Sequence, residues 1–260
     1  MQPLRSARMS RKLKNSTARK SFAGLAIVAA IGLLVIAAIQ MLGDDKKSDG
    51  SSTAATETNP MYAELAKTAK RDADDPLALG RADAPVVMVE YSDFQCQFCK
   101  VFATKIEPQL IADYVDKGVL RIEWRSMAIF GPESEDAARA AWAAGQQGKF
   151  WEYHRALFDN APEKKNTGVF TRDKLVELAG AAGVPDIAKF RADLESPAAT
   201  AAVQANVNEG IGIGVNSTPA FLINGRPILG TQPIEQFRAA IEAARATAGQ
   251  PTGAAGKATE

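Results

Sequence analysis

The sequence predicts an α/β fold in which a mixed central sheet is flanked by helices. The β-branched run V-V-M-V-E-Y, residues Val86–Tyr91, is typical of a strand that is buried on both faces. Residues Val119–Met127 read as a second strand, and the helical segment between the two favours a parallel pair. After Gly214, two short apolar segments flank Asn224-Gly225, which is typical of a tight hairpin between antiparallel strands.

The N-terminal end of the chain is strongly basic and the remainder is acidic. Residues 1–21 contain seven of the 31 Lys and Arg residues and no acidic residue. The rest of the chain therefore has 24 basic residues against 30 acidic ones, a net charge of −6. A basic tip on an acidic body argues against a body that binds nucleic acid, and we expect no nucleic-acid partner.

Residues 22–42 are apolar and uncharged, and they are long enough to cross a lipid bilayer. As a helix they would extend about 31 Å, close to the hydrocarbon thickness of a membrane. The basic residues before them predict a cytoplasmic N-terminus and an extracytoplasmic body in a single-pass protein of the cell membrane. A cleaved signal peptide is the alternative, although I-Q-M-L-G-D-D after the run is a poor cleavage site. Under either interpretation, the body of the protein is exported from the cytoplasm.

The body is predicted to lie between two polar segments. We expect residues 43–75 to form a polar linker with a short helix within 61–74, and residues 247–260 to form a disordered tail. The domain between them, 76–246, would carry the sheet and a helical insert at about 132–212.

Several residues mark the ends of the elements in this domain. A helix is expected to begin at the cysteines, and Pro108 should kink or interrupt it. Thr171 and the pair Ser196-Pro197 are suited to begin helices of the insert. Pro227 lacks an amide donor, so its strand should lie at a sheet edge. The last helix should begin near Pro233 and bury the apolar stripe Ile234, Phe237, Ile241 and Ala244.

The chain has only two cysteines, Cys96 and Cys99, in a C-x-x-C arrangement. A zinc site needs about four ligands, and His154 is the only histidine, so a metal site would require carboxylates or a second copy of the chain. A passive disulfide closing so small a loop would remove little entropy from the unfolded chain. The body is also long enough to bury a core without disulfides. These comparisons favour a redox centre, with no metal and no organic cofactor.

A cysteine at the start of a helix has a specific chemical property. The free amide groups and the dipole of the first turn favour an anion, so the pKa of Cys96 should lie well below the usual value of about 8.5. The Cys96 thiolate would attack disulfides. Cys99, one turn later and more buried, would resolve the resulting mixed disulfide.

Three motifs together resemble the DsbA-like thiol–disulfide oxidoreductases of the thioredoxin superfamily. They are V-M-V-E-Y-S-D-F-Q-C-Q-F-C, G-K-F-W-E-Y-H-R-A-L-F and G-V-N-S-T-P-A-F-L-I-N-G. The resemblance covers roughly residues 76–246 and implies a thioredoxin fold with an inserted helical subdomain, preceded here by one N-terminal transmembrane helix.

The resemblance also implies roles for individual residues. Pro219 would be cis and lie against the cysteines, with the side chain of Thr218 facing the active site. The backbone beside Pro219 would pair with an extended substrate strand. Glu90 occupies the position of a buried acid that transfers protons with the resolving thiol, and Arg125 is its expected partner. The simpler interpretation of Glu90 is an exposed acid at a strand end.

The two residues between the cysteines depart from the pattern of the strongest oxidants in this family. Gln97 and Phe98 stand where many relatives have proline and then histidine, and neither adds a charge or a ring N–H to stabilise a thiolate. We expect both residues to contact substrate, and we expect a milder oxidant. His154 is interpreted as a packing or surface residue, and Trp124, Trp142, Met88 and Met127 as core residues.

The sequence therefore predicts a membrane-anchored, extracytoplasmic oxidoreductase that introduces disulfides into exported polypeptides with free cysteines. The resemblance implies a quinone-linked membrane protein as the partner that reoxidises it. One alternative is a reductase or isomerase of exported disulfides. A second is a scaffold domain without enzymatic activity that retains the fold.

Overall fold

The computed structural model describes residues 59–248. The expected basic segment 1–21, the expected transmembrane helix 22–42 and most of the expected tail therefore lie outside the described residues, as does the first half of the expected linker. Within residues 59–248, each helix is too short or too polar to cross a bilayer.

Five strands form one mixed sheet in the order β1-β3-β2-β4-β5. β2 (Val86–Ser92) and β3 (Leu120–Ser126) run parallel at its centre and are buried along their whole length. β1 (Ala78–Leu79), β4 (Ala220–Ile223) and β5 (Arg226–Leu229) are antiparallel to their neighbours. The predicted mixed sheet, its parallel pair and the edge position of the proline-containing strand are confirmed. The sequence does not predict β1, because two residues are too few to show the alternation of a strand.

The helix that follows β2 continues past Pro108 instead of breaking there. α3 (Gln97–Val101) leads through a π-helical turn, Phe102–Ile106, into α4 (Glu107–Leu110), and a second π-helical turn follows at Ile111–Val115. A proline has no amide and crowds the carbonyl four residues before it. The wider turns on both sides accommodate Pro108, so the regular α-helix is interrupted there, as expected, while the chain stays helical.

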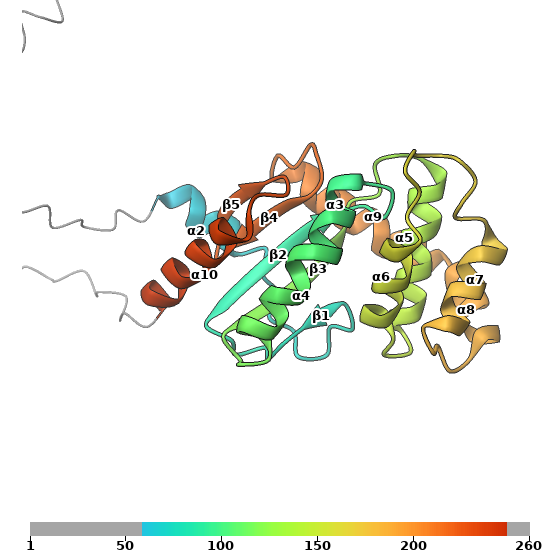
Figure 1. The fold of residues 1–260 in the computed structure, drawn as a ribbon, viewed down its shortest axis with the longest axis horizontal. Coiled ribbons are helices and arrows are strands. Elements are labelled where there is room, and N and C mark those ends of the chain that lie inside the picture. The colour runs from blue at the N-terminus through green and yellow to red at the C-terminus, as the bar shows by residue number, and fades with distance from the viewer. Residues whose placement is uncertain (1–58, 249–260) are drawn as a thin grey trace, which may run out of the picture. The chain divides into compact units, whose positions relative to one another are not determined.

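Five helices lie between β3 and β4 and form a group at one end of the sheet (Figure 1). They are α5 (Pro132–Gly145), α6 (Phe150–Asp159), α7 (Arg172–Ala181), α8 (Ile187–Leu194) and α9 (Pro197–Gly212). α5 packs against α6, α8 and α9, and α9 returns along the sheet beside β3.

Two of these helices begin at the residues that the sequence indicates. The hydroxyl of Thr171 accepts from the amide of Lys174 at 3.2 Å. The hydroxyl of Ser196 accepts from the amide of Ala199 at 3.1 Å. Each hydroxyl satisfies an amide that has no partner within its own helix, so both predicted N-caps are confirmed.

The C-terminal part of the chain forms the predicted hairpin and helix. Asn224 and Gly225 have φ values of 45° and 83°, the left-handed conformation that a tight turn between β4 and β5 requires. α10 (Ile234–Ala248) follows and buries Phe237 and Ile241 against the sheet. Ile234, the first residue of the expected stripe, is only half-buried.

The two faces of the sheet pack against different elements. Side chains of β2 alternate between the faces, so Val86 and Met88 meet α10 and the segment from α3 to α4. Val87 and Tyr91 point the other way and pack with Met127, residues near the C-terminal end of α9, and Leu65. The expected core positions of Met88 and Met127 are confirmed, since both are fully buried.

The helix predicted within 61–74 is shorter than expected. α2 spans Pro60–Ala66, and the chain then leaves the helical conformation, with Arg71 at a φ of 52°. The amides of Lys70 and Arg71 donate to the buried carboxylate of Glu123 on β3, at 2.9 and 2.8 Å. This carboxylate binds the backbone that a longer helix would have used internally.

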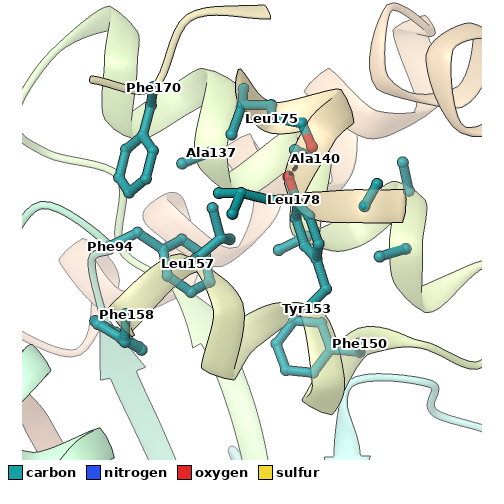
Figure 2. Packing of buried hydrophobic residues seen from close by; sticks show 14 of the residues in the cluster. Phe94, Ala137, Ala140, Phe150, Tyr153, Leu157, Phe158, Phe170, Leu175 and Leu178 are labelled. Atoms are coloured by element: carbon teal, nitrogen blue, oxygen red, sulfur yellow. Dashed lines mark hydrogen bonds between the residues drawn. The ribbon is translucent and has the colours of Figure 1, made fainter. Parts of the chain in front are cut away.

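The core of the helical insert reaches the segment that precedes the cysteines. Figure 2 shows Phe94 pointing into a cluster with Leu157 and Phe158 of α6. In the same view the hydroxyl of Tyr153 donates to the carbonyl of Leu175, at 2.9 Å, which joins α6 to α7. The segment before the cysteines is thus anchored in the packing of the insert. Trp124 also belongs to this core, whereas Trp142 is only half-buried.

Candidate active site

Cys96 and Cys99 lie where β2 gives way to α3. Cys96 is the N-cap residue of α3, with an extended backbone, and the amide of Cys99 donates to its sulfur at 3.4 Å. The two sulfurs are not bonded to each other in this structure. Cys96 is 4% exposed and Cys99 is completely buried, so both thiols are buried and Cys99 is the deeper of the two.

The two thiols differ strongly in acidity. A hydrogen bond from the Cys99 side chain is the largest cause that lowers the pKa of Cys96, to about 6 from an ordinary value of 9.0. Contacts with Thr218 and with the backbone amides of Cys99 and Phe98 lower it further, while burial opposes them. Burial is the first cause that raises the pKa of Cys99 well above its ordinary value, and the charge of Cys96 adds to it. The expected acidity of Cys96 is present, but the neighbouring thiol contributes more to it than the amides do.

The loop before β4 brings Thr218 and Pro219 to the cysteines. The Thr218–Pro219 peptide bond is cis, and the thiol of Cys96 donates to the carbonyl of Thr218 at 3.3 Å. The hydroxyl of Thr218 is buried and has no hydrogen-bond partner among the described residues. The structure therefore places the backbone of Thr218 in direct contact with the reactive sulfur.

The two residues between the cysteines face outward. The side-chain amide of Gln97 donates to the carbonyl of Pro162, which lies in the loop after α6. The Phe98 ring is 67% exposed, and its carbonyl accepts from the hydroxyl of Thr231 at 2.6 Å. Gln97 thus links the active-site turn to the helical insert, and Phe98 links it to the segment after β5.

Glu90 lies on β2 and is completely buried, so it is not an exposed acid at a strand end. Burial raises the pKa of Glu90 to about 8, and the nearby hydroxyl of Ser92 offsets part of this rise. Neither carboxyl oxygen has a hydrogen-bond partner among the described residues. A buried acid with this pKa holds its proton at neutral pH and can exchange it near neutrality.

The expected pairing of Glu90 with Arg125 is wrong. In the parallel register Glu90 stands opposite Trp124, and Arg125 stands opposite Tyr91. Because neighbouring side chains of a strand point to opposite faces, the Arg125 guanidinium lies on the other side of the sheet. There it donates to Glu123 at 2.9 Å and to Glu209 of α9 at 3.1 Å.

A buried polar network holds the chain just before the cysteines, and the sequence does not predict it. The carboxylate of Asp93 accepts from the amide of Gln95 at 2.8 Å, the hydroxyl of Ser134 at 2.7 Å and the amide of Ile129 at 3.0 Å. The side chain of Gln95 accepts from the amide of Asn166 at 2.7 Å. The only sequence signal for this network is the motif D-F-Q before the cysteines, and that motif indicates no more than a turn.

A second buried group, also missed by the sequence, consists of Glu107 and His154. His154 packs edge-on against Trp124 and Phe158, with ring centroids 4.9 and 4.8 Å away. Its Nδ1 lies 3.8 Å from a carboxyl oxygen of Glu107. Burial lowers the pKa of His154 to about 3, so the imidazole is neutral at physiological pH. The interpretation of His154 as a packing residue is confirmed, but its polar neighbour was not foreseen.

The site can therefore carry out thiol chemistry without further groups from the chain. The pKa of the Cys96 thiol is lowered, the pKa of the Cys99 thiol is raised, and a buried acid, Glu90, lies on β2. Within residues 59–248, no three His, Cys, Asp or Glu side chains come together as a metal site would require.

A family model described as Thioredoxin matches residues 72–243. Disulfide bond formation protein D of Bacillus subtilis is 29% identical over 168 residues, which are 63% of this chain and 74% of that protein. The crystal structure of oxidised BdbD from the same organism superposes with a TM-score of 0.62 at 26% identity, covering 66% of this chain and 94% of that one.

Other similar proteins are much longer. The Na(+)/H(+) antiporter NhaA 3 of Salinispora tropica is 31% identical over 179 residues, which are 68% of this chain and 26% of that protein. The chain thus spans about a quarter of the length of the antiporters that it matches.

Proposed function

The chain belongs to the thioredoxin family as a DsbA-like thiol–disulfide oxidoreductase, and from that premise we propose that it introduces disulfides into exported polypeptides. Cys96 is the nucleophile in this proposal and Cys99 the resolving cysteine. The single observation that carries the direction of the reaction is the acidity of Cys96.

A stabilised thiolate favours the reduced enzyme, and an enzyme whose reduced form is stabilised is an oxidant. The lowered pKa of Cys96 therefore supports an oxidant. The absence of charge and ring N–H groups in Gln97 and Phe98 supports an oxidant milder than DsbA.

The reaction proceeds by two thiol–disulfide exchanges. A substrate thiolate attacks the Cys96 sulfur of the oxidised enzyme, and the bond between Cys96 and Cys99 breaks. Cys99 leaves with the electron pair and takes a proton, and we propose the buried carboxyl of Glu90 on β2 as the donor. A second substrate thiolate then attacks the substrate sulfur of the mixed disulfide, so that Cys96 leaves as a thiolate and the substrate gains a disulfide.

An apolar rim beside Cys96 supports the binding of unfolded polypeptides. Phe98 is 67% exposed, Leu229 on the edge strand is 63% exposed, and Val101 is 47% exposed. The hydrogen bond from Thr231 to Phe98 keeps the end of β5 beside the active-site turn. We propose that an extended substrate pairs with the backbone at Thr218 and Pro219 while its apolar side chains contact this rim.

We propose an extracytoplasmic location and a tether through residues 22–42, on the ground of their composition and of the basic residues before them. The dithiol would then pass two electrons to a quinone-linked membrane protein. A tethered active site would remain close both to that partner and to chains that emerge from the export machinery.

The experiment that tests the proposal replaces each cysteine with serine in the full chain. Cys99→Ser leaves Cys96 able to form a bond with a substrate sulfur and removes the Cys99 thiol that would displace that substrate again, so mixed disulfides with exported proteins should accumulate. Cys96→Ser should form none. If both variants form mixed disulfides equally, or if neither forms any, the roles assigned to Cys96 and Cys99 are wrong.

The direction of electron flow requires a second measurement. The oxidised chain should convert a reduced, unfolded model protein to its disulfide form, and Cys96–Cys99 should be oxidised in cells. A site that is reduced in cells and a potential near that of thioredoxin, about −270 mV, would instead favour the reductase.

A further inference from the structure

Thr231, in the segment after β5, contacts the peptide group that joins Phe98 to Cys99. The hydroxyl of Thr231 donates to the carbonyl of Phe98 at 2.6 Å, across a separation of 133 residues in the chain. The N–H of the same peptide group belongs to Cys99 and donates to the Cys96 sulfur at 3.4 Å. A peptide group is planar and rigid, so one unit links the Thr231 hydroxyl to the reactive sulfur.

The backbone around Thr231 is held in place on the side of the loop before β4. The amide of Gly230 donates to the carbonyl of Pro219 at 2.9 Å. The side-chain amide of Gln232 donates to the carbonyl of Leu229 at 2.7 Å. The segment that carries Thr231 therefore bridges two parts of the active site, the loop before β4 and the first turn of α3.

The Phe98 carbonyl accepts two hydrogen bonds, which use both of its lone pairs. One comes from Thr231, and the other comes from the amide of Phe102 in the next turn of the helix. A hydrogen bond accepted at one end of a peptide group polarises it and strengthens the bond donated at the other end, by about 10–30%. The Cys99 amide should therefore donate more strongly to the Cys96 sulfur than it would without Thr231.

Charged side chains do not replace this effect at the Cys96 sulfur. The pKa of Cys96 is lowered by the Cys99 thiol first, and then by Thr218 and two backbone amides. The charged residues nearest in the sequence are bonded elsewhere. Asp93 accepts from three neutral donors, and Lys100 donates to a backbone carbonyl of the insert. The strength of each amide hydrogen bond therefore matters directly for a Cys96 anion.

We propose that Thr231 is a positioning residue of the active site, which holds the Phe98–Cys99 peptide group and strengthens the hydrogen bond from its N–H to the Cys96 sulfur. Thr231 acts through that peptide group and donates to neither sulfur. The proposal rests on the function proposed above, because stabilisation of the Cys96 thiolate favours the reduced enzyme.

The contribution of Thr231 to the reaction follows from the charge on Cys96. When the oxidised enzyme reacts with two substrate thiols, the bond between Cys96 and Cys99 breaks and a bond forms between the substrate sulfurs. The two electrons pass to the enzyme sulfurs, one proton passes to Cys99, and the other passes to water because Cys96 remains a thiolate. The Cys96 sulfur carries a charge only in the reduced form, so loss of the Thr231 hydroxyl should weaken the oxidant.

Ultraviolet absorbance of the thiolate in the reduced, full-length chain tests the proposal. Thr231→Val keeps the shape of the side chain and removes its hydroxyl. The midpoint of the Cys96 titration should therefore rise from about 6, by about 0.2–0.6 pH unit. Thr231→Ser keeps a hydroxyl and should restore the wild-type midpoint. An unchanged midpoint in Thr231→Val, or an equally raised one in Thr231→Ser, would overturn the proposal.

Thr104→Val is the matched control on the same helical segment. The hydroxyl of Thr104 also donates to a backbone carbonyl, that of Lys100, at 2.7 Å. The N–H of that peptide group belongs to Val101, so its polarisation does not reach the Cys96 sulfur through the Cys99 amide. Thr104→Val should leave the midpoint of Cys96 unchanged, and a rise equal to that of Thr231→Val would contradict the assigned path.

Equilibration with glutathione provides the second measurement. The equilibrium constant for oxidation of glutathione by the Cys96–Cys99 disulfide should fall about 1.5- to 4-fold in Thr231→Val. It should stay near wild type in Thr231→Ser and Thr104→Val, and an unchanged constant in Thr231→Val would overturn the proposal. If the oxidised wild type forms no disulfides in reduced model proteins, the proposed function fails, whereas the absorbance titration still decides the role of Thr231.

Discussion

At the scale of single residues, the site gives two chemically identical thiols different pKa values. Cys96 lies at the N-terminal end of α3, where a neighbouring thiol and backbone amides face its sulfur. Cys99 is one turn further into the core, where burial retains its proton. The same turn of helix therefore gives one thiol a lowered pKa and the other a raised pKa, and the difference follows from depth and from the hydrogen bonds that each sulfur makes.

The cause of the low Cys96 pKa can be tested by removing the largest contribution. Alkylation of the reduced wild type as a function of pH should follow the Cys96 thiolate with a midpoint near 6. Cys99→Ala removes the thiol that donates to Cys96, so its midpoint should move upward. An unchanged midpoint would show that the backbone amides of the first turn dominate.

The lowered pKa of Cys96 also determines how the stability of the reduced protein changes with pH. Because the folded pKa of Cys96 is depressed from 9.0, the thiolate stabilises the reduced fold fully above pH 9. This stabilisation is lost as the pH falls through about 6. The difference in unfolding free energy between reduced wild type and Cys96→Ala should accordingly shrink over that range.

At the scale of elements, the approach of α9 to the sheet positions the helical insert over the end of β3. A Cβ atom at Gly210 would lie 2.9 Å from the sulfur of Met127 and 3.2 Å from the ring of Tyr91. Gly212, two residues later on the same helix, faces open space. Close packing therefore requires a glycine at position 210 but not at position 212, a difference that cannot be seen in the sequence.

These glycines form a matched pair for mutation. Gly210→Ala should lower the free energy of unfolding by about 1–3 kcal/mol, because the added methyl group must displace buried neighbours. Gly212→Ala should instead raise it by about 0.5–1 kcal/mol, since alanine is the better helix former. Chemical denaturation of both variants measures the contrast, and similar effects from both would contradict the close packing of α9.

At the scale of the whole described unit, a buried ionic network joins the segment before the sheet to the sheet itself. Glu123 accepts from the amides of Lys70 and Arg71 and pairs with Arg121 and Arg125, at 3.0 and 2.9 Å. These hydrogen bonds and charges outweigh burial and lower the pKa of Glu123. Backbone amides 53 and 52 residues before Glu123 are thereby held to the sheet by one carboxylate.

Removal of this charge should be strongly destabilising. Glu123→Gln leaves two buried arginines without their shared partner and should lower the free energy of unfolding by about 3–5 kcal/mol. Glu64→Gln removes an exposed ion pair with Lys67 and should cost about 0–1 kcal/mol. Thermal or denaturant unfolding at neutral pH compares the two, and equal effects would show that the buried network adds nothing.

The pH dependence of this network has a definite sign. The depressed folded pKa of Glu123 means that its contribution is present above the unfolded value of about 4.5 and is lost as the pH falls below it. Wild type should therefore lose stability on acidification more steeply than Glu123→Gln.

Much of the fold and the chemical centre was predictable from the sequence, because both depend on local patterns. The β-branched run of β2 and the Asn224-Gly225 turn specify their own backbone conformations. The C-x-x-C pair at the start of a helix indicates redox chemistry through spacing alone. Each of these signals is contained in fewer than a dozen consecutive residues.

The remaining features were decided by tertiary structure, because they depend on which face of the sheet a side chain occupies. Arg125 is one residue from the position opposite Glu90, and the parallel register places it on the other side of the sheet. Glu107 and His154 come from different helices and meet only because α6 packs against the turn that precedes Glu107. The sequence by itself determined that the two cysteines lie at the start of a helix after a buried strand, and the packing of distant elements decided which acids are buried in the same core.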